Sequence, residues 1–196
     1  MKIRHLTFML ALLLALSVVG ASLAEFDYSV FDNNENFEVV TDVFDGTVTV
    51  NLTDKFNPIT VDTSDGKATD TMTMIATFGT EPGILFIIKV NGVHNFKDMT
   101  LLPDKTRYTI KVNSSPESPY ENGAFVVTSD LMPMFDEIIE KQITSVRYRL
   151  SGDDNVDSVL VINVEQLNLL LDLYKEAGGM NQDFSVLKTI FPVTVK

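Results

Sequence analysis

The segment Ile84-Leu85-Phe86-Ile87-Ile88 decides the fold, because it places apolar side chains at five consecutive positions. Side chains on a strand point alternately to its two faces, so a strand of this composition must be covered on both. Turn signals stand on either side of the segment, at Thr80-Glu81-Pro82-Gly83 and at Asn91-Gly92. The segment therefore predicts a central strand with packed layers above and below it.

The chain around this strand, from residue 26 to residue 128, mostly alternates apolar and polar residues, which is the period of half-buried strands. Further turn signals separate the alternating runs at Asp45-Gly46, Ser64-Asp65-Gly66, Ser114 to Pro119 and Asn122-Gly123. The predicted strands are Phe37 to Val43, Thr47 to Leu52, Thr71 to Phe78, Ile84 to Val90, Tyr108 to Val112 and Ala124 to Thr128. Short strands spaced in this way are typical of an antiparallel sheet protein.

At Ser129 the period changes to that of a helix. Ser129 or Asp130 is expected to cap a helix that has Pro133 in its early turn and ends near Lys141. Its apolar face contains Leu131, Met134, Phe135, Ile138 and Ile139.

Beyond this helix the pattern predicts a β-hairpin, a second helix and a closing strand. Val146 to Leu150 and Val159 to Val161 alternate on either side of the polar loop at Ser151 to Asn155. A helix is expected from about Glu165 to Ala177, stopped by Gly178-Gly179, and a closing strand from Ile190 to Val195, where Pro192 favours an edge. We therefore predict a mainly β protein, with α+β as the alternative, built as an antiparallel β-sandwich or flattened barrel with two amphipathic helices in the C-terminal half.

Residues 1–24 have the three-part layout of a secretory signal peptide. Lys2 and Arg4 precede an apolar stretch from Phe8 to Val19, and the small residues of Gly20-Ala21-Ser22-Leu23-Ala24 follow. The apolar stretch is shorter than the about 20 residues that a membrane anchor needs. We expect cleavage after Ala24, a single globular β-rich domain over residues 25–196, and a secreted or periplasmic product.

Charge and composition exclude several classes of function. Removing residues 1–24 leaves 13 basic against 27 acidic side chains, a net charge of −14 over 172 residues. This balance opposes binding to nucleic acid or to anionic membranes, which require clustered Lys and Arg. The chain contains no cysteine, which excludes thiol nucleophiles, disulfides and cysteine-based metal sites.

Two oxygen-rich loops are weak candidates for calcium. Asp32-Asn33-Asn34-Glu35-Asn36 alternates oxygen side chains, but Phe37 and Val43 stand where an EF-hand loop requires Gly and Glu. The loop from Asp153 to Asp157 is a second cluster at a hairpin tip. Ordinary turn chemistry explains both loops, so no metal-binding residue is assigned.

Catalytic candidates are equally sparse. His94 is the one histidine beyond residue 24, and no nucleophile motif lies near it, so an exposed loop histidine is the simpler interpretation. Paired carboxylates are the remaining acid–base machinery, and with 27 acidic residues some pairs arise by chance. No catalytic or cofactor-binding residue is assigned, and no cofactor is expected.

Two further groups of side chains have both a structural and a functional interpretation. Arg147, Arg149, Arg107 and Lys111 form a basic stripe that either binds an anionic partner or, as we favour, pairs with carboxylates across the sheet. Met72, Met74, Met132 and Met134 either fill the core, as we favour, or line an adaptable groove.

The stretch from Phe135 to Tyr174 resembles, in its pattern, the C-terminal half of small exported bacterial β-sandwich proteins of the invasion-associated locus B type. The shared features are a short helix, a strand like Val146 to Leu150, a polar turn, a strand like Val159 to Ile162 and a leucine-rich helix. The resemblance covers about a quarter of the chain after residue 24. It implies the sandwich fold and assigns no functional residue.

The sequence thus indicates an exported, soluble, non-catalytic binding or accessory protein of the bacterial cell envelope or extracellular space. Its partner is an unidentified protein or small molecule. One alternative is a carboxylate-dependent hydrolase of polysaccharide, which requires two carboxyl groups facing each other across a cleft. The other is a self-associating surface or matrix component, which requires a long, uncovered edge strand.

The signal-peptide prediction is tested by expressing the chain in a bacterial host with a secretion pathway. The expected product in the exported fraction begins at Glu25, as read by N-terminal sequencing and intact mass. An Ala24→Tyr variant should be processed poorly, because the cleavage site requires a small residue there. A product that keeps residues 1–24 and stays in the cytoplasm would contradict the prediction.

Overall fold

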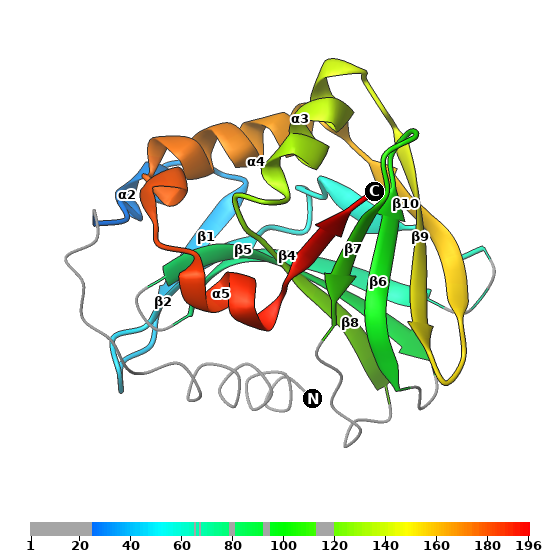
Figure 1. Ribbon diagram of the computed structural model, residues 1–196. Helices are drawn as coiled ribbons and strands as arrows, with labels where there is room; N and C mark the ends of the chain where they lie inside the picture. The colour runs from blue at the N-terminus through cyan, green and yellow to red at the C-terminus, as the bar shows by residue number, and fades with distance from the viewer. Residues whose placement is uncertain (1–24, 65, 67, 79–80, 92–94, 113–119) are drawn as a thin grey trace.

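Two antiparallel sheets with helices packed against them form the structure, as seen in a computed structural model (Figure 1). It describes residues 25–64, 66, 68–78, 81–91, 95–112 and 120–196, without the side chains of 68–70 and 120–123. The predicted signal peptide, 1–24, lies outside the described residues. The sheets form a sandwich-like pair and not a closed barrel, so the sandwich is the correct one of the two predicted architectures.

Sheet A contains the strand that the sequence marks as central. Its five strands follow the order β1-β2-β4-β5-β8. They are β1 (Phe37–Thr41), β2 (Val48–Leu52), β4 (Ala68–Phe78), β5 (Glu81–Asn91) and β8 (Tyr120–Val127). Residues 81 to 88 of β5 are all buried, which confirms that this strand is covered on both faces.

Sheet B has six strands in the order β11-β7-β6-β9-β10-β3. They are β3 (Ile59–Val61), β6 (Phe96–Leu102), β7 (Tyr108–Lys111), β9 (Ser145–Gly152), β10 (Val156–Ile162) and β11 (Val193–Val195). The predicted hairpin is β9 and β10, paired from Val156 with Leu150 to Val161 with Ser145. The closing strand β11 lies at the edge of the sheet, as Pro192 indicates.

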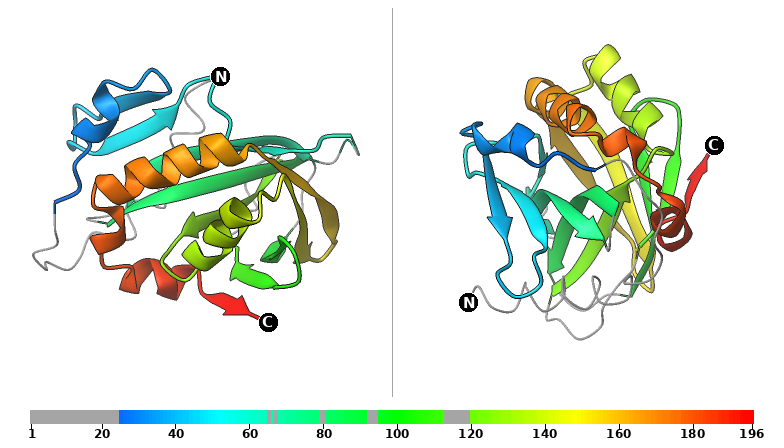
Figure 2. Two further views of the ribbon diagram at one scale, coloured as in Figure 1. Left: turned by 90° about the horizontal axis from the view of Figure 1, so that it is seen from above. Right: turned by 90° about the vertical axis from the view of Figure 1, so that its left-hand side faces the viewer.

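The helices are α2 (Ser29–Asp32), α3 (Met132–Glu140), α4 (Val164–Glu176) and α5 (Ser185–Ile190), with a 3₁₀ turn, η1 (Gly179–Asn181). The two predicted amphipathic helices are α3 and α4, which lie side by side over the sheets (Figures 1 and 2). No helix in the described part of the chain is long and apolar enough to cross a membrane.

Aromatic rings connect α3 to the centre of sheet A. Phe86 of β5 stacks on Phe125 of β8 at 5.0 Å and on Phe135 of α3 at 5.9 Å between ring centroids. All three rings are buried. Stacked rings add about 0.5–1.5 kcal/mol per pair to the stabilisation that burial alone provides.

Helix α4 is fixed at both ends. The side chain of Asn163 accepts a hydrogen bond from the Gln166 backbone at its N-terminus. At its other end Gly178 adopts a φ of +88°, a left-handed conformation that favours glycine and ends the helix. The buried Tyr174 hydroxyl donates a 2.8 Å hydrogen bond to the Pro82 carbonyl and so joins α4 to β5.

Several predicted boundaries were wrong. Glu81-Pro82-Gly83 and Asn122-Gly123 are not turns: the first begins β5 opposite Ala76 to Phe78, and the second lies within β8 opposite Lys89 and Ile88. Strands β3 and β6 and helices α2 and α5 were not predicted.

Helix α3 starts later than predicted. Its N-cap is Leu131, and neither Ser129 nor Asp130 caps it, because the Leu131 amide bonds to Thr128 in a preceding turn. Asp130 instead pairs with Lys188 at 2.8 Å. The end at Lys141 is as predicted.

Replacing Tyr174 by Phe tests the connection between α4 and β5. The variant leaves the buried Pro82 carbonyl without its donor, which should lower the free energy of unfolding by about 1–3 kcal/mol. Chemical denaturation followed by circular dichroism measures the change. Tyr28→Phe removes the hydroxyl of a half-buried tyrosine that bonds to Thr77 and should cost less. Equal stability of wild type and Tyr174→Phe would show that this hydrogen bond contributes nothing.

Candidate functional site

The best candidate site lies where β2 separates from β4. The two strands pair at two positions, Val50 with Ile75 and Asn51 with Met74. Strand β4 continues for six more residues, to Ala68, still paired with β5 on its other side. After Leu52 the chain leaves sheet A and enters sheet B as β3. A wedge therefore opens between the edge of β4 and the connecting segment 53–58.

The connecting segment is held in place by α4 and by the core. The Asn57 amide donates to Gln166 Oε1 at 2.8 Å, and the amide of Asn163 donates to the Pro58 carbonyl at 2.9 Å. Phe56 is buried and its ring lies 5.0 Å from that of Phe37. One wall of the wedge is thus fixed before any ligand arrives, which lowers the entropic cost of binding.

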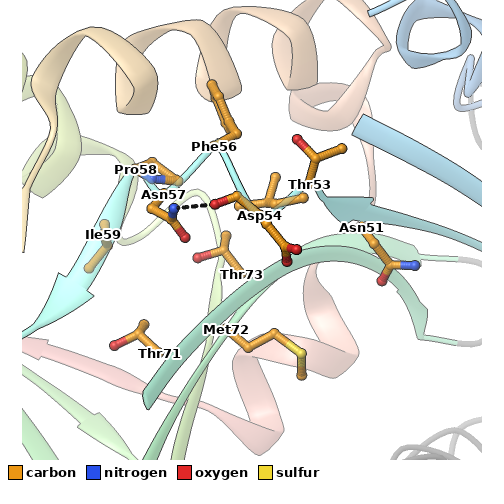
Figure 3. A pocket seen from close by; sticks show the side chains of 11 residues that line it. Asn51, Thr53, Asp54, Phe56, Asn57, Pro58, Ile59, Thr71, Met72 and Thr73 are labelled. Carbon is orange, nitrogen blue, oxygen red and sulfur yellow. Dashed lines mark hydrogen bonds between the residues drawn. The ribbon is translucent and has the colours of Figure 1, made fainter. Parts of the chain in front are cut away.

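The wedge encloses a pocket of about 340 Å³, at the lower end of the volumes typical of small-molecule sites (Figure 3). It is lined by residues of β2, β3, β4 and the connecting segment: Asn51, Leu52, Thr53, Asp54, Phe56, Asn57, Pro58, Ile59, Thr71, Met72 and Thr73. We call this the wedge pocket. Its lining combines apolar side chains with several polar ones, which is the composition of many ligand sites.

Two threonines of β4 form the other wall. Thr71 and Thr73 are two residues apart on one strand, so they share a face, and both line the wedge pocket. Thr73 is buried, and the buried Thr71 hydroxyl has no hydrogen-bond partner among the described residues. A buried hydroxyl without a partner is uncommon in folded proteins and destabilising. Because this oxygen has almost no accessible surface, the Thr71 side chain would have to turn toward the pocket before a ligand could bond to it.

A second pocket, of about 330 Å³, lies beside α5 and the end of α4. Its lining includes Asp183, Ser185 and Lys188. The Asp183 carboxylate accepts a hydrogen bond from the Ser185 amide, and Lys188 pairs with Asp130, so both charged groups already have partners.

A buried carboxyl lies close to this second pocket but does not line it. Glu81 is 7 % exposed, and burial, with a smaller contribution from the negative charge of Asp183, raises the pKa of its carboxyl. The hydrolase alternative needs two carboxyl groups facing each other across a cleft. In the part of the chain that the structure describes, a single carboxylate lines each pocket: Asp54 in the wedge pocket and Asp183 in the second.

Both oxygen-rich loops contain internal bonds. In the first, the Asn34 side chain accepts a hydrogen bond from the Asn36 amide, and Asp32 is the last residue of α2. In the second, Asp157 pairs with Arg149 at 2.6 Å. Among the residues that the structure describes, no three His, Cys, Asp or Glu side chains gather into a possible metal site.

Two of the four side chains of the basic stripe pair with carboxylates across the sheet, as favoured. Arg149 lies opposite Asp157 and Lys111 opposite Asp98, with ion pairs of 2.6 and 3.0 Å. Arg147 is exposed on the same face of β9 as Arg149, while Arg107 pairs through its backbone with Lys196. Exposed pairs of this kind contribute little stability.

The methionines divide between core and site. Met74, Met132 and Met134 are buried, as the core interpretation predicts, whereas Met72 is partly buried and lines the wedge pocket. His94 lies outside the described residues.

Of the residues that line the wedge pocket, Met72 alone was considered from the sequence as a possible binding residue. One signal was present: the polar, proline-containing run Asp54-Lys55-Phe56-Asn57-Pro58 stands between two apolar runs. It indicates a turn, but nothing in it shows that β4 lies opposite.

Comparison with known proteins gives no match: no family model, no curated protein and no solved structure resembles this chain significantly. The likeness of residues 135–174 to proteins of the invasion-associated locus B type therefore rests on the sequence pattern alone.

The buried Glu81 carboxyl makes stability depend on pH. Because its pKa is raised above the ordinary value of 4.5, its contribution to the free energy of unfolding is full below that pH and is lost as the pH rises through the higher value. Glu81→Gln stays neutral and should therefore gain stability relative to wild type as the pH rises from about 4 to about 7. Denaturation at several pH values measures this difference.

The matched control is Glu140→Gln, which removes an exposed carboxylate on α3. Its stability relative to wild type should vary less with pH than that of Glu81→Gln. A difference between Glu81→Gln and wild type that stays constant over the whole range would contradict the burial argument.

Proposed function

We propose that this protein is an exported, non-catalytic binding protein of the bacterial cell envelope or extracellular space, and that the wedge pocket is its ligand site. One observation carries the proposal: the separation of β2 from β4 opens a pocket of about 340 Å³ that has one fixed wall and several polar side chains in its lining. Export rests on the signal-peptide layout of residues 1–24.

Two features support binding over the alternative functions. Among the described residues, one carboxylate lines the wedge pocket, whereas glycoside hydrolysis commonly uses two. Of the four edge strands, β1, β3 and β11 are five, three and three residues long, and short edges resist strand addition. The remaining edge strand, β8, has eight residues, so among the described strands it is the one edge long enough for the self-association alternative.

The proposal is tested by nuclear magnetic resonance on the purified, isotope-labelled protein with five small probes: glycerol, glucose, benzyl alcohol, benzylamine and benzoate. At least one should shift the backbone amides of residues 51–57, 59 and 71–73 in a saturable manner. A Thr71→Phe variant fills the pocket and should abolish those shifts. The control Thr109→Phe, on β7 of sheet B, should keep them.

The proposal fails if none of the probes shifts these amides. It fails also if Thr71→Phe folds like wild type, as its spectrum shows, and leaves the shifts unchanged.

A further inference from the structure

The free hydrogen-bonding groups of the wedge pocket are mainly acceptors. The side-chain Nδ2 of Asn57 donates one of its two N–H groups to the Asp54 carbonyl at 2.9 Å, which leaves its Oδ1 as an acceptor and one further N–H (Figure 3). The hydroxyl of Thr53 donates to the Glu35 carbonyl at 3.4 Å, so its lone pairs remain. Each of these two side chains therefore directs one donor into the protein, and together they keep more acceptor positions than donors.

The other polar groups leave this bias in place. Hydroxyls of Thr71 and Thr73 and the Asn51 amide can donate or accept. The unpaired edge of β4 offers backbone donors and acceptors alike, whereas the Asp54 carboxylate only accepts. A ligand that complements this set must supply more donors than acceptors.

The charge of the lining points the same way. Among the residues that the structure describes, Asp54 is the one charged residue that lines the wedge pocket, and Lys55, its neighbour in sequence, is not part of the lining. The chain as a whole has a net charge of −12. An anionic ligand would meet repulsion from Asp54, and no described residue of the lining has a basic side chain to offset it, whereas a cation would be attracted.

The rest of the lining limits the kind of cation. Leu52, Pro58, Ile59 and Met72 contribute apolar surface to the pocket. A calcium or magnesium ion needs six or more oxygen ligands and gains nothing from such a surface. An organic ammonium needs only three acceptors, and its hydrocarbon part can cover the apolar side chains.

We infer that the wedge pocket takes a small organic molecule that carries a primary ammonium group on an apolar body, with the ammonium held by Asp54 and the neighbouring neutral oxygens. The inference rests on the proposed function, because it names the ligand class of the same pocket.

The experiment compares three of the probes that share one ring and differ in their polar group: benzylamine, benzyl alcohol and benzoate. Dissociation constants come from titrations followed at the amides of residues 51–57, 59 and 71–73. Benzylamine should bind about fivefold more tightly than benzyl alcohol, as expected for a solvent-accessible ion pair of about 1 kcal/mol. Benzoate should bind least. Added salt should weaken the binding of benzylamine and leave that of benzyl alcohol unchanged.

Two variants locate the effect. Asp54→Asn keeps the shape of the side chain and should remove the preference for benzylamine, so that both probes bind within about twofold of each other. The matched control, Asp157→Asn, removes a carboxylate from the solvent face of sheet B and should keep the preference.

The outcomes separate the two proposals. If benzyl alcohol binds the pocket as tightly as benzylamine, or benzoate binds best, the pocket remains a ligand site and the ammonium inference is wrong. The same holds if Asp54→Asn keeps the preference, or if calcium chloride shifts these amides and benzylamine does not. If no probe of the full set shifts them, the proposed function itself fails.

Discussion

The whole structure depends on β5, because both faces of this strand must be covered by other parts of the protein. Residues 81 to 88 are buried without a break, so one layer on each side of sheet A is required. On one side the requirement is met by Phe135 of α3, which stacks on Phe86. Near the start of the strand Leu187 of α5 approaches Gly83, where a Cβ atom would lie 3.5 Å from its side chain. The C-terminal helices are thus part of the core.

The sequence predicts the fold where the alternation of side chains is regular, and fails where backbone geometry interrupts it. Strand β6 escapes detection because a register shift between Phe96 and Asp98 displaces the buried positions Met99 and Leu101 from the alternation that Phe96 begins. Pro82 and Gly83 look like a turn, yet both lie in β5. Pro82 fits into the strand because pairing with β8 starts only at Ile84. Position 83 requires glycine because a Cβ there would lie 2.8 Å from the side chain of Val126. These causes lie in contacts with residues that are distant in sequence, so the local sequence does not reveal them.

The wedge pocket was beyond prediction for a similar reason. Its walls come from segments about twenty residues apart in the chain, 51–59 and 71–73, which approach each other because β2 and β3 belong to different sheets. Turn chemistry explains the path of residues 53–58, but the space beside β4 exists only because a strand ends early there. Residues of ordinary type, among them Asn57 and Thr71, acquire a potential role from this arrangement alone.

Because the chain changes sheet after Leu52, the two walls of the wedge pocket belong to different layers of the protein. One wall moves with sheet A through β4, while the other is attached to sheet B through Ile59 and to α4 through Gln166. The width of the opening therefore depends on the spacing of the two layers, which is fixed by core side chains, most of them outside the lining of the pocket. Substitutions in the core would therefore change the affinity for a ligand that they do not contact. A bound ligand would in turn hold the two layers together and oppose their separation.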